Sequence, residues 1–480
     1  MTLQTLTSLP YGSANIMWAV GCTLLLLLAY SYIHFVRPST GKVPSLGKYP
    51  NTIFSIPTER IPTLIIPRKF LPEIGNLPES QVSLHREVYE RFMGKYTRIL
   101  KSHHLESFVR HNLVKDIRHY FWVVDLETKS AVDKAFSGQD FCDWRPIATF
   151  QMILGLVASV SERVFAGPEL CKNTEWVKLT IDCAVATAQL AASMTSTPSW
   201  WRPVKALYCN EMKTMDRAYV RAAELLAEDV AKRHGASTPP DLIDTMLKDP
   251  SVQSDDFDLL ARIQIEAAQA VHFNLAFSLM HALNDLATHP EYSEPLRKEW
   301  DEMLRNNDGH LTYQATTEMR KLDSFLKESQ RLHPQSLASV SRWIVSAITL
   351  SDGTVLPKNS SVSAPTLGVN LDPSLWQDPE MFDGFRFEHL REKGGNANEN
   401  KYQFASSSLD ELNFGYGQHA CPGRWFVSMQ SKLTIGYILQ HYDLKMGVGS
   451  HAENVITGIR NTPNLEGKLF FKARERSTHV

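Results

Sequence analysis

The sequence of 480 residues lacks several features that would each assign it to a well-defined class of protein. It has no close pair of cysteines, the six being Cys22, Cys142, Cys171, Cys183, Cys209 and Cys421. Such scatter argues against a disulfide framework and is typical of a reducing compartment. The net charge of −2 argues against nucleic acid as a bulk electrostatic partner. Internal repeats and a glycine-rich dinucleotide fingerprint are also missing, so no motif indicates a flavin or nicotinamide site.

Charge is missing from the N-terminal segment, since residues 1–36 contain no lysine, arginine, aspartate or glutamate. Ile16–Val36 is a mostly apolar run that is long enough to span a bilayer as a helix. Basic residues follow this run before any acidic one, and the positive-inside rule then predicts a cytosolic remainder. We predict a lumenal segment at 1–15, a transmembrane anchor at 16–36, a proline-rich linker at 37–52 and a catalytic domain at 53–480. The alternative, a cleaved signal peptide, lacks its basic n-region here.

The stretch Phe414–Gly423, FGYGQHACPG, carries the clearest chemical signal. Its single cysteine, Cys421, is followed by Pro422 and by the apolar, helix-forming run Trp425–Leu439. Because proline suits the first position of a helix, we predict Cys421 at a helix N-terminus, where free N–H groups favour a thiolate. Glycines in this stretch let the backbone approach a flat object closely, and His419 supplies a donor.

The order of Phe414, Gly417, His419, Cys421 and Gly423 resembles the haem-binding signature of the cytochrome P450 family. The family usually has arginine where this chain has His419, and that exchange is compatible with a contact to a haem propionate. The resemblance implies that Cys421 is the axial ligand of the iron of haem b. The alternative is a buried structural cysteine beside a glycine-rich turn.

Two further motifs of the family lie upstream of the cysteine. Glu328 and Arg331 are three residues apart on a predicted helix, Leu322–Leu332, and so share a face. In the family such a pair is buried and locked to an arginine of a later loop, here Arg386, and the resemblance implies a triad that braces the cysteine loop. Arg342 matches a position from which the family reaches a haem propionate, and a solvated strand arginine is the alternative.

A long helix is predicted from an N-cap at Ser254 to Thr288, where His289-Pro290 stops it. Its middle is apolar nearly all round, which indicates a buried helix, and the resemblance implies that it crosses the distal face of the haem. The family usually has an acid or amide followed by threonine at this point, to deliver protons to dioxygen. Here those places fall at Asn274 and Leu275, and the latter has no hydroxyl. A satisfied core pair of His272 and Asn274 is the alternative.

Residues 80–250 are predicted to be largely helical by their apolar spacing, with examples at Phe150–Phe165 and Met215–Ala231. A loop containing Trp200 and Trp201 interrupts them and resembles the family's membrane-touching loop, although core packing is an equal alternative. Asp352-Gly353 is predicted to be the turn of a hairpin, and Arg391–Leu409 to be a surface loop.

Taken together, the resemblance implies a mainly α fold with a small β-rich lobe, preceded by one transmembrane helix, of the fungal microsomal type. It implies a monooxygenase that inserts oxygen from O2 into an apolar small molecule, such as a terpenoid-like secondary metabolite. Electrons would come from NADPH through a separate NADPH–cytochrome reductase, with cytochrome b5 as an optional second donor. The predicted location is the endoplasmic reticulum membrane, with the catalytic domain in the cytosol and no nucleic-acid partner.

Two alternatives stay open. The absent threonine at Leu275 favours a haem-thiolate catalyst of rearrangement, cyclisation or oxidative coupling instead of hydroxylation. The second is a haem-binding but catalytically impaired shortened form. It is motivated by the family's amphipathic helix and further strand residues, which have no counterpart before the short extended pieces at Ile53–Leu71.

Overall fold

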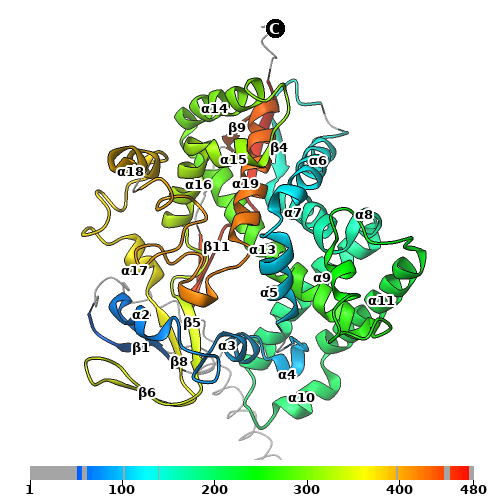
Figure 1. Ribbon diagram of the computed structural model, residues 1–480, viewed down its shortest axis with the longest axis vertical. Coiled ribbons are helices and arrows are strands. Elements are labelled where there is room, and N and C mark those ends of the chain that lie inside the picture. Colours follow the sequence, from blue (N-terminus) through cyan, green and yellow to red (C-terminus); the bar gives the residue numbers. More distant parts are fainter. Residues whose placement is uncertain are drawn as a thin grey trace, which may run out of the picture. The chain divides into compact units, whose positions relative to one another are not determined.

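The computed structural model describes residues 51–56, 62–100, 103–138, 140–395, 398–447 and 454–474 (Figure 1). The predicted segments 1–15 and 16–36, and all but the last two residues of the predicted linker, lie outside the described residues. The α-helices are α2 (Leu71–Ile74), α3 (Leu84–Arg91), α4 (Gly94–Thr97), α5 (His104–Phe108), α6 (Ile117–Ala135), α7 (Thr149–Phe165), α8 (Gly167–Leu170), α9 (Thr174–Thr195), α10 (Arg202–Tyr208), α11 (Asn210–Lys232), α12 (Leu242–Met246), α13 (Phe257–Thr288), α14 (Ser293–Arg305), α15 (Tyr313–Glu318), α16 (Arg320–Leu332), α17 (Thr366–Asn370), α18 (Arg386–Gly394) and α19 (Arg424–His441). A π-helical turn, η3 (Val109–Leu113), follows α5, and 3₁₀ turns occur at η2 (Arg68–Phe70), η4 (Pro290–Tyr292) and η6 (Gly417–His419).

The strands gather into small sheets. The largest has the order β1 (Phe54–Ile56), β2 (Thr63–Ile65), β8 (Ser361–Ala364), β5 (Ser339–Ile344) and β3 (Val82–Ser83). Its β2–β8 pair is parallel and its other pairs are antiparallel. The other sheets join β4 (Arg145–Ala148), β12 (Lys468–Ala473) and β9 (Tyr442–Met446), then β6 (Ile348–Thr349) with β7 (Val355–Leu356), and β10 (Val455–Thr457) with β11 (Arg460–Thr462). The described chain is therefore mainly helical with small sheets, as predicted.

Helix α13 is the central element of the helical part. It contacts α7, α9, α11, α16 and α19, and Figure 1 shows it passing among these helices. Its apolar middle is buried, which agrees with a sequence that is apolar nearly all round. The predicted N-cap at Ser254 is wrong: the side chain of Asp256 accepts a hydrogen bond from the backbone N–H of Leu259, at 3.0 Å, and the helix begins at Phe257. The predicted end at Thr288 is confirmed.

Several other predictions can be compared with the structure. The helices predicted at Phe150–Phe165 and Met215–Ala231 are confirmed as α7 and as part of α11. The hairpin is confirmed as β6–β7, with Gly353 in the left-handed region at φ 83°. The surface loop predicted from Arg391 is wrong at its start, because Arg391 lies in α18 and is buried against Asp323.

The tryptophan pair is exposed, which excludes the core-packing alternative. Trp200 and Trp201 lie in the turn between α9 and α10, with 75% and 40% of their surface accessible. Leu207 and Tyr208, at the end of α10, are exposed as well. Among the described residues, none of the helices is both long and apolar enough to cross a membrane.

Candidate active site

Cys421 lies between the turn η6 and helix α19. Its backbone N–H donates to the carbonyl oxygen of Phe414 at 2.7 Å, and this hydrogen bond closes the loop between Phe414 and Cys421. Helix α19 begins at Arg424 with Gly423 as its N-cap, so the prediction of Pro422 as the first helical residue is wrong. Cys421 still lies close to the helix end, two residues before the N-cap, where unpaired N–H groups gather.

The cysteine lies deep in the protein yet keeps part of its surface accessible. Burial raises the pKa of the Cys421 thiol above its usual value, and the N–H groups of Gly423 and Arg424 only partly oppose that rise. Burial and the helix end therefore act on the thiol in opposite directions, and a metal cation at the sulfur would favour the thiolate.

The glycines of the loop differ in whether the structure requires glycine at their positions. Gly415 and Gly417 both have left-handed backbone, with φ values of 82° and 73°. A Cβ on Gly417 would lie only 2.5 Å from the carbonyl oxygen of Gly75, so the loop rests directly on the end of α2. At Gly423 a Cβ would meet only Val109, at 3.8 Å, so no tight protein contact requires glycine there.

Glu328, Arg331 and Arg386 come together in a buried cluster. The carboxylate of Glu328 accepts from Arg331 Nε and Nη2 at 2.8 and 2.7 Å, and from Arg386 Nε at 3.1 and 3.2 Å. It also accepts from the backbone N–H of Asp383 at 3.0 Å. Arg386 is the first residue of α18, not part of a loop as expected. The two guanidinium groups also donate to backbone carbonyls, for example Arg331 Nη1 to Pro379 at 2.6 Å.

Sequence reasoning missed how this cluster reaches the cysteine loop. Arg331 Nη1 donates to the carbonyl oxygen of Asn370 at 2.7 Å, and Asn370 Nδ2 donates back to that of Arg331 at 2.8 Å. Asn370 Nδ2 also donates to Asn413 Oδ1 at 3.1 Å, one residue before Phe414. A second missed connection is the buried ion pair of Lys327 and Glu411, at 2.8 Å. No periodicity in the sequence marks these residues.

The distal-helix residues separate into buried and exposed positions. Leu275 is buried, with 2% of its surface accessible, whereas Asn274 is exposed and donates from Nδ2 to the Ala270 carbonyl oxygen at 2.9 Å. His272 is fully buried, with Nε2 3.3 Å from the carboxylate of Glu162. His272 and Asn274 therefore do not form one core polar pair, since only His272 lies in the core.

A comparison with protein-family models matches residues 145–464 to the model described as "Cytochrome P450". The chain belongs to the cytochrome P450 family. Two curated relatives are cytochrome P450 monooxygenases of fungi. BOA4 of Botryotinia fuckeliana is 33% identical over 410 residues, covering 84% of this chain and 82% of BOA4. The braC protein of Annulohypoxylon truncatum is 34% identical over 408 residues, covering 83% and 80%.

A solved cytochrome P450 has the same fold. The retinoic acid-bound cyanobacterial CYP120A1 superposes with a TM-score of 0.66 at 17% sequence identity, covering 88% of this chain and 92% of that one. With the family membership, this makes the chain a P450 oxidoreductase of the monooxygenase class, and haem is the cofactor of that family. The predicted family and the mainly helical P450 fold are thus confirmed, while the predicted N-terminal transmembrane helix lies outside the described residues.

The cysteine loop fits a haem of this P450. Three buried nitrogen donors around it, Arg342 Nε, His419 Nδ1 and Arg424 Nε, have no hydrogen-bond partner among the described residues. Burial lowers the pKa of Arg342 to about 10 and also lowers the pKa of His419. An anionic group such as a haem propionate would supply acceptors and negative charge together. Arg342 is buried, which excludes the solvated strand arginine.

Proposed function

We propose that this protein is a haem-thiolate monooxygenase in which Cys421 is the axial ligand of the haem iron. The observation that carries the proposal is Cys421 itself: a deeply placed thiol with part of its surface accessible, in a loop beside three buried nitrogen atoms, on Arg342, His419 and Arg424, that have no hydrogen-bond partner among the described residues. A structural cysteine has no need of such donors. When bound, the haem supplies dioxygen activation, and a thiolate ligand favours O–O cleavage.

The residues of the chain have separate tasks in this proposal. Arg342 and His419 hold the propionate edge, and Arg424 anchors the loop by donating from Nη1 to the Cys421 carbonyl oxygen at 2.8 Å. Phe414 packs edge-on against the buried Phe404, with ring centroids 5.5 Å apart, which holds the start of the cysteine loop in place. The Glu328–Arg331–Arg386 cluster holds the loop through Asn370 and Asn413, as its hydrogen bonds support.

For the substrate we propose an apolar small molecule, of the terpenoid-like kind made in fungal secondary metabolism. One oxygen atom of O2 enters a C–H bond or an alkene, and the other leaves as water after uptake of two electrons and two protons. The electrons come from NADPH through a separate reductase, with cytochrome b5 as an optional donor. The fungal monooxygenases among the relatives support the reaction class, while the substrate rests on analogy.

We further propose that the chain acts at the endoplasmic reticulum membrane with its catalytic domain in the cytosol. The apolar, uncharged run Ile16–Val36 supports an anchor. The exposed side chains of Trp200, Trp201 and Leu207 support a second contact, because aromatic rings favour the membrane interface. Separation of the full chain and of a chain lacking residues 1–36 between membrane and soluble fractions tests both contacts.

A second candidate reaction is favoured by Leu275. The exposed Asn274 can use its amide oxygen to orient a water, because its Nδ2 is engaged with Ala270, but no hydroxyl follows it. A haem-thiolate rearrangement, cyclisation or oxidative coupling would not depend on that hydroxyl. Turnover under ¹⁸O₂ separates the two reactions: a product containing ¹⁸O supports oxygen insertion, and an unlabelled product rules out simple hydroxylation.

The first experiment is the carbon-monoxide difference spectrum of the reduced, membrane-expressed protein. The proposal predicts a strongly red-shifted Soret band for the wild type and for Cys183→Ser, a buried cysteine that serves as the control. Cys421→Ser should lose that band while still being expressed. Retention of the red-shifted band by Cys421→Ser would rule out Cys421 as the ligand. Substrate-dependent NADPH consumption then tests the catalytically impaired alternative.

A further inference from the structure

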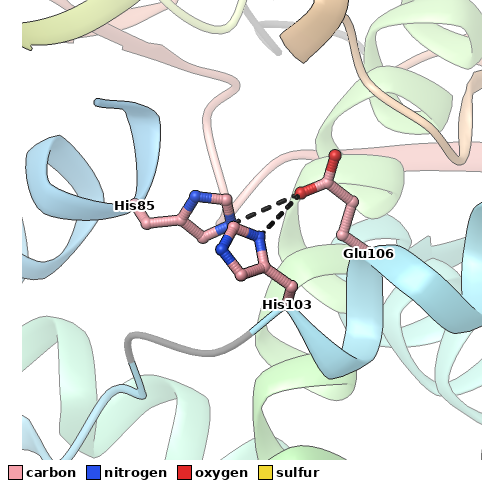
Figure 2. Close-up of side chains that lie close together, drawn as sticks. All are labelled: His85, His103 and Glu106. Atoms are coloured by element: carbon pink, nitrogen blue, oxygen red, sulfur yellow. Dashed lines mark ion pairs between the residues drawn. The ribbon is translucent and has the colours of Figure 1, made fainter. Parts of the chain in front are cut away.

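Two histidines and a glutamate outside the cysteine loop converge on one point. His85 comes from α3, His103 immediately precedes α5, and Glu106 lies in α5 (Figure 2). Glu106 Oε2 lies 3.3 Å from His85 Nε2 and 3.7 Å from His103 Nδ1. One ligand atom from each residue lies within 4.8 Å of the other two. Sequence reasoning did not single out these residues, because they come from two separate segments.

These separations are close to those of a tetrahedral metal site. Zinc binds imidazole nitrogen and carboxylate oxygen at about 2.0–2.2 Å, which places neighbouring ligand atoms about 3.3 Å apart. The two distances to Glu106 are already near that value. The imidazole rings of His85 and His103 stand edge to face, with centroids 3.9 Å apart. His103 has 64% of its side chain exposed, so its ring can turn to complete the geometry.

The groups behind the three side chains also resemble the surroundings of a metal site. Glu79 Oε1 lies 3.0 Å from His85 Nδ1, which orients that ring and leaves Nε2 to face Glu106. Arg110 Nε donates to Glu106 Oε1 at 2.8 Å, which leaves Oε2 to face the histidines. A carboxylate behind a ligating histidine and a donor behind a ligating carboxylate fix ligand orientation in known metal sites.

The charge of the cluster suits a divalent cation. The carboxylates of Glu79 and Glu106 both lie against His85, at 3.0 Å from Nδ1 and 3.3 Å from Nε2. A dication bound to His85 Nε2 would compensate the charge of both carboxylates. Arg110 neutralises part of the negative charge, which favours a moderate affinity over a permanently filled structural site.

We propose that His85, His103 and Glu106 form a binding site for a divalent transition metal of the zinc class, with a fourth position open to solvent. Imidazole ligands favour zinc over magnesium, which prefers oxygen ligands. Because Glu79 also lies 3.4 Å from His419 Nε2, the site adjoins the cysteine loop without sharing a ligand with it.

The test is equilibrium dialysis of the untagged, full-length holoprotein against zinc chloride, with zinc and iron measured by elemental mass spectrometry. We expect about one zinc per haem at micromolar free zinc, with no competition from millimolar magnesium. His103→Asn and His85→Asn should each weaken binding at least tenfold. Protein that keeps its reduced carbon-monoxide band is used throughout, so a loss of folding is not read as a loss of zinc.

His119→Asn is the matched control. His119 Nδ1 lies 3.7 Å from the carboxylate of Asp116, the same distance that separates His103 Nδ1 from Glu106. In both pairs the two residues are three positions apart in the sequence. His119 is exposed, and among the described residues no second imidazole lies in an equivalent place. Zinc binding should therefore be unchanged in this variant. Equal binding by the wild type and by both cluster variants, or no binding by the wild type, overturns the proposal.

Discussion

Removal of the charge at Glu328 offers a severe test of how the cysteine loop is held. Glu328→Gln keeps the size of the side chain but leaves the guanidinium groups of Arg331 and Arg386 buried without a counter-charge. The new amide nitrogen cannot accept hydrogen bonds, so at least one arginine contact meets a donor instead of an acceptor. Both arginines stay fixed by backbone carbonyls and cannot simply turn toward water.

The expected loss is about 3–5 kcal/mol of unfolding free energy, the usual penalty for a buried ion pair that loses one partner. That corresponds to a factor of roughly 10² to 10³ or more in the ratio of folded to unfolded protein. Since folded proteins are stable by about 5–15 kcal/mol, the variant should lose a large part of its stability. Loss of the red-shifted carbon-monoxide band during urea titration at 20 °C measures the difference.

Glu302→Gln in α14, at an exposed position, is the control and should behave as the wild type. Arg331→Lys should fall between the two, because it keeps the charge but loses the paired hydrogen bonds to the carboxylate. A Glu328→Gln variant that loses less than about 1 kcal/mol would refute the argument from uncompensated buried charge.

Three further predictions address single groups. Burial raises the pKa of Glu266 to about 7, so the native state holds a proton that the unfolded state releases near pH 4.5, and the free energy of unfolding should fall as the pH rises from 4.5 to 7. Glu266→Gln should therefore gain about 3 kcal/mol relative to the wild type at pH 8 but little at pH 5. Urea titrations at both pH values measure this difference, and the exposed Glu228→Gln should not show it. Asn274→Thr should change the ratio of product formed to NADPH consumed. Leu275→Thr places a hydroxyl in the core and should mainly lose about 2–4 kcal/mol of unfolding free energy in the same urea titration. The opposite pattern would mean that the side chain of Leu275 faces the bound substrate. His419→Arg should slow haem transfer to apomyoglobin if His419 contacts a propionate, and an unchanged rate would count against that contact.

The parts of the molecule that could be predicted from sequence are those encoded locally. The spacing of Glu328 and Arg331 was enough to bring both onto one helix face, and the end of α13 follows from His289-Pro290. The cap of α13 was misassigned because several adjacent residues are good caps and only backbone geometry selects Asp256. The contact of Asn370 with Asn413 could not be foreseen, since tertiary packing alone brings these two residues together.

The contact of Gly417 with Gly75 has a consequence for the order in which the protein forms. The floor of the cysteine loop is supplied by α2, near the start of the described chain, whereas the loop itself lies near its end. The pairing of β4 with β12 joins equally distant segments. Contacts between such distant segments form slowly, because the intervening chain loses entropy before the contacts stabilise it. A nascent chain therefore cannot complete this part of the molecule until nearly all of it has been synthesised, and haem capture should be a late, post-translational event.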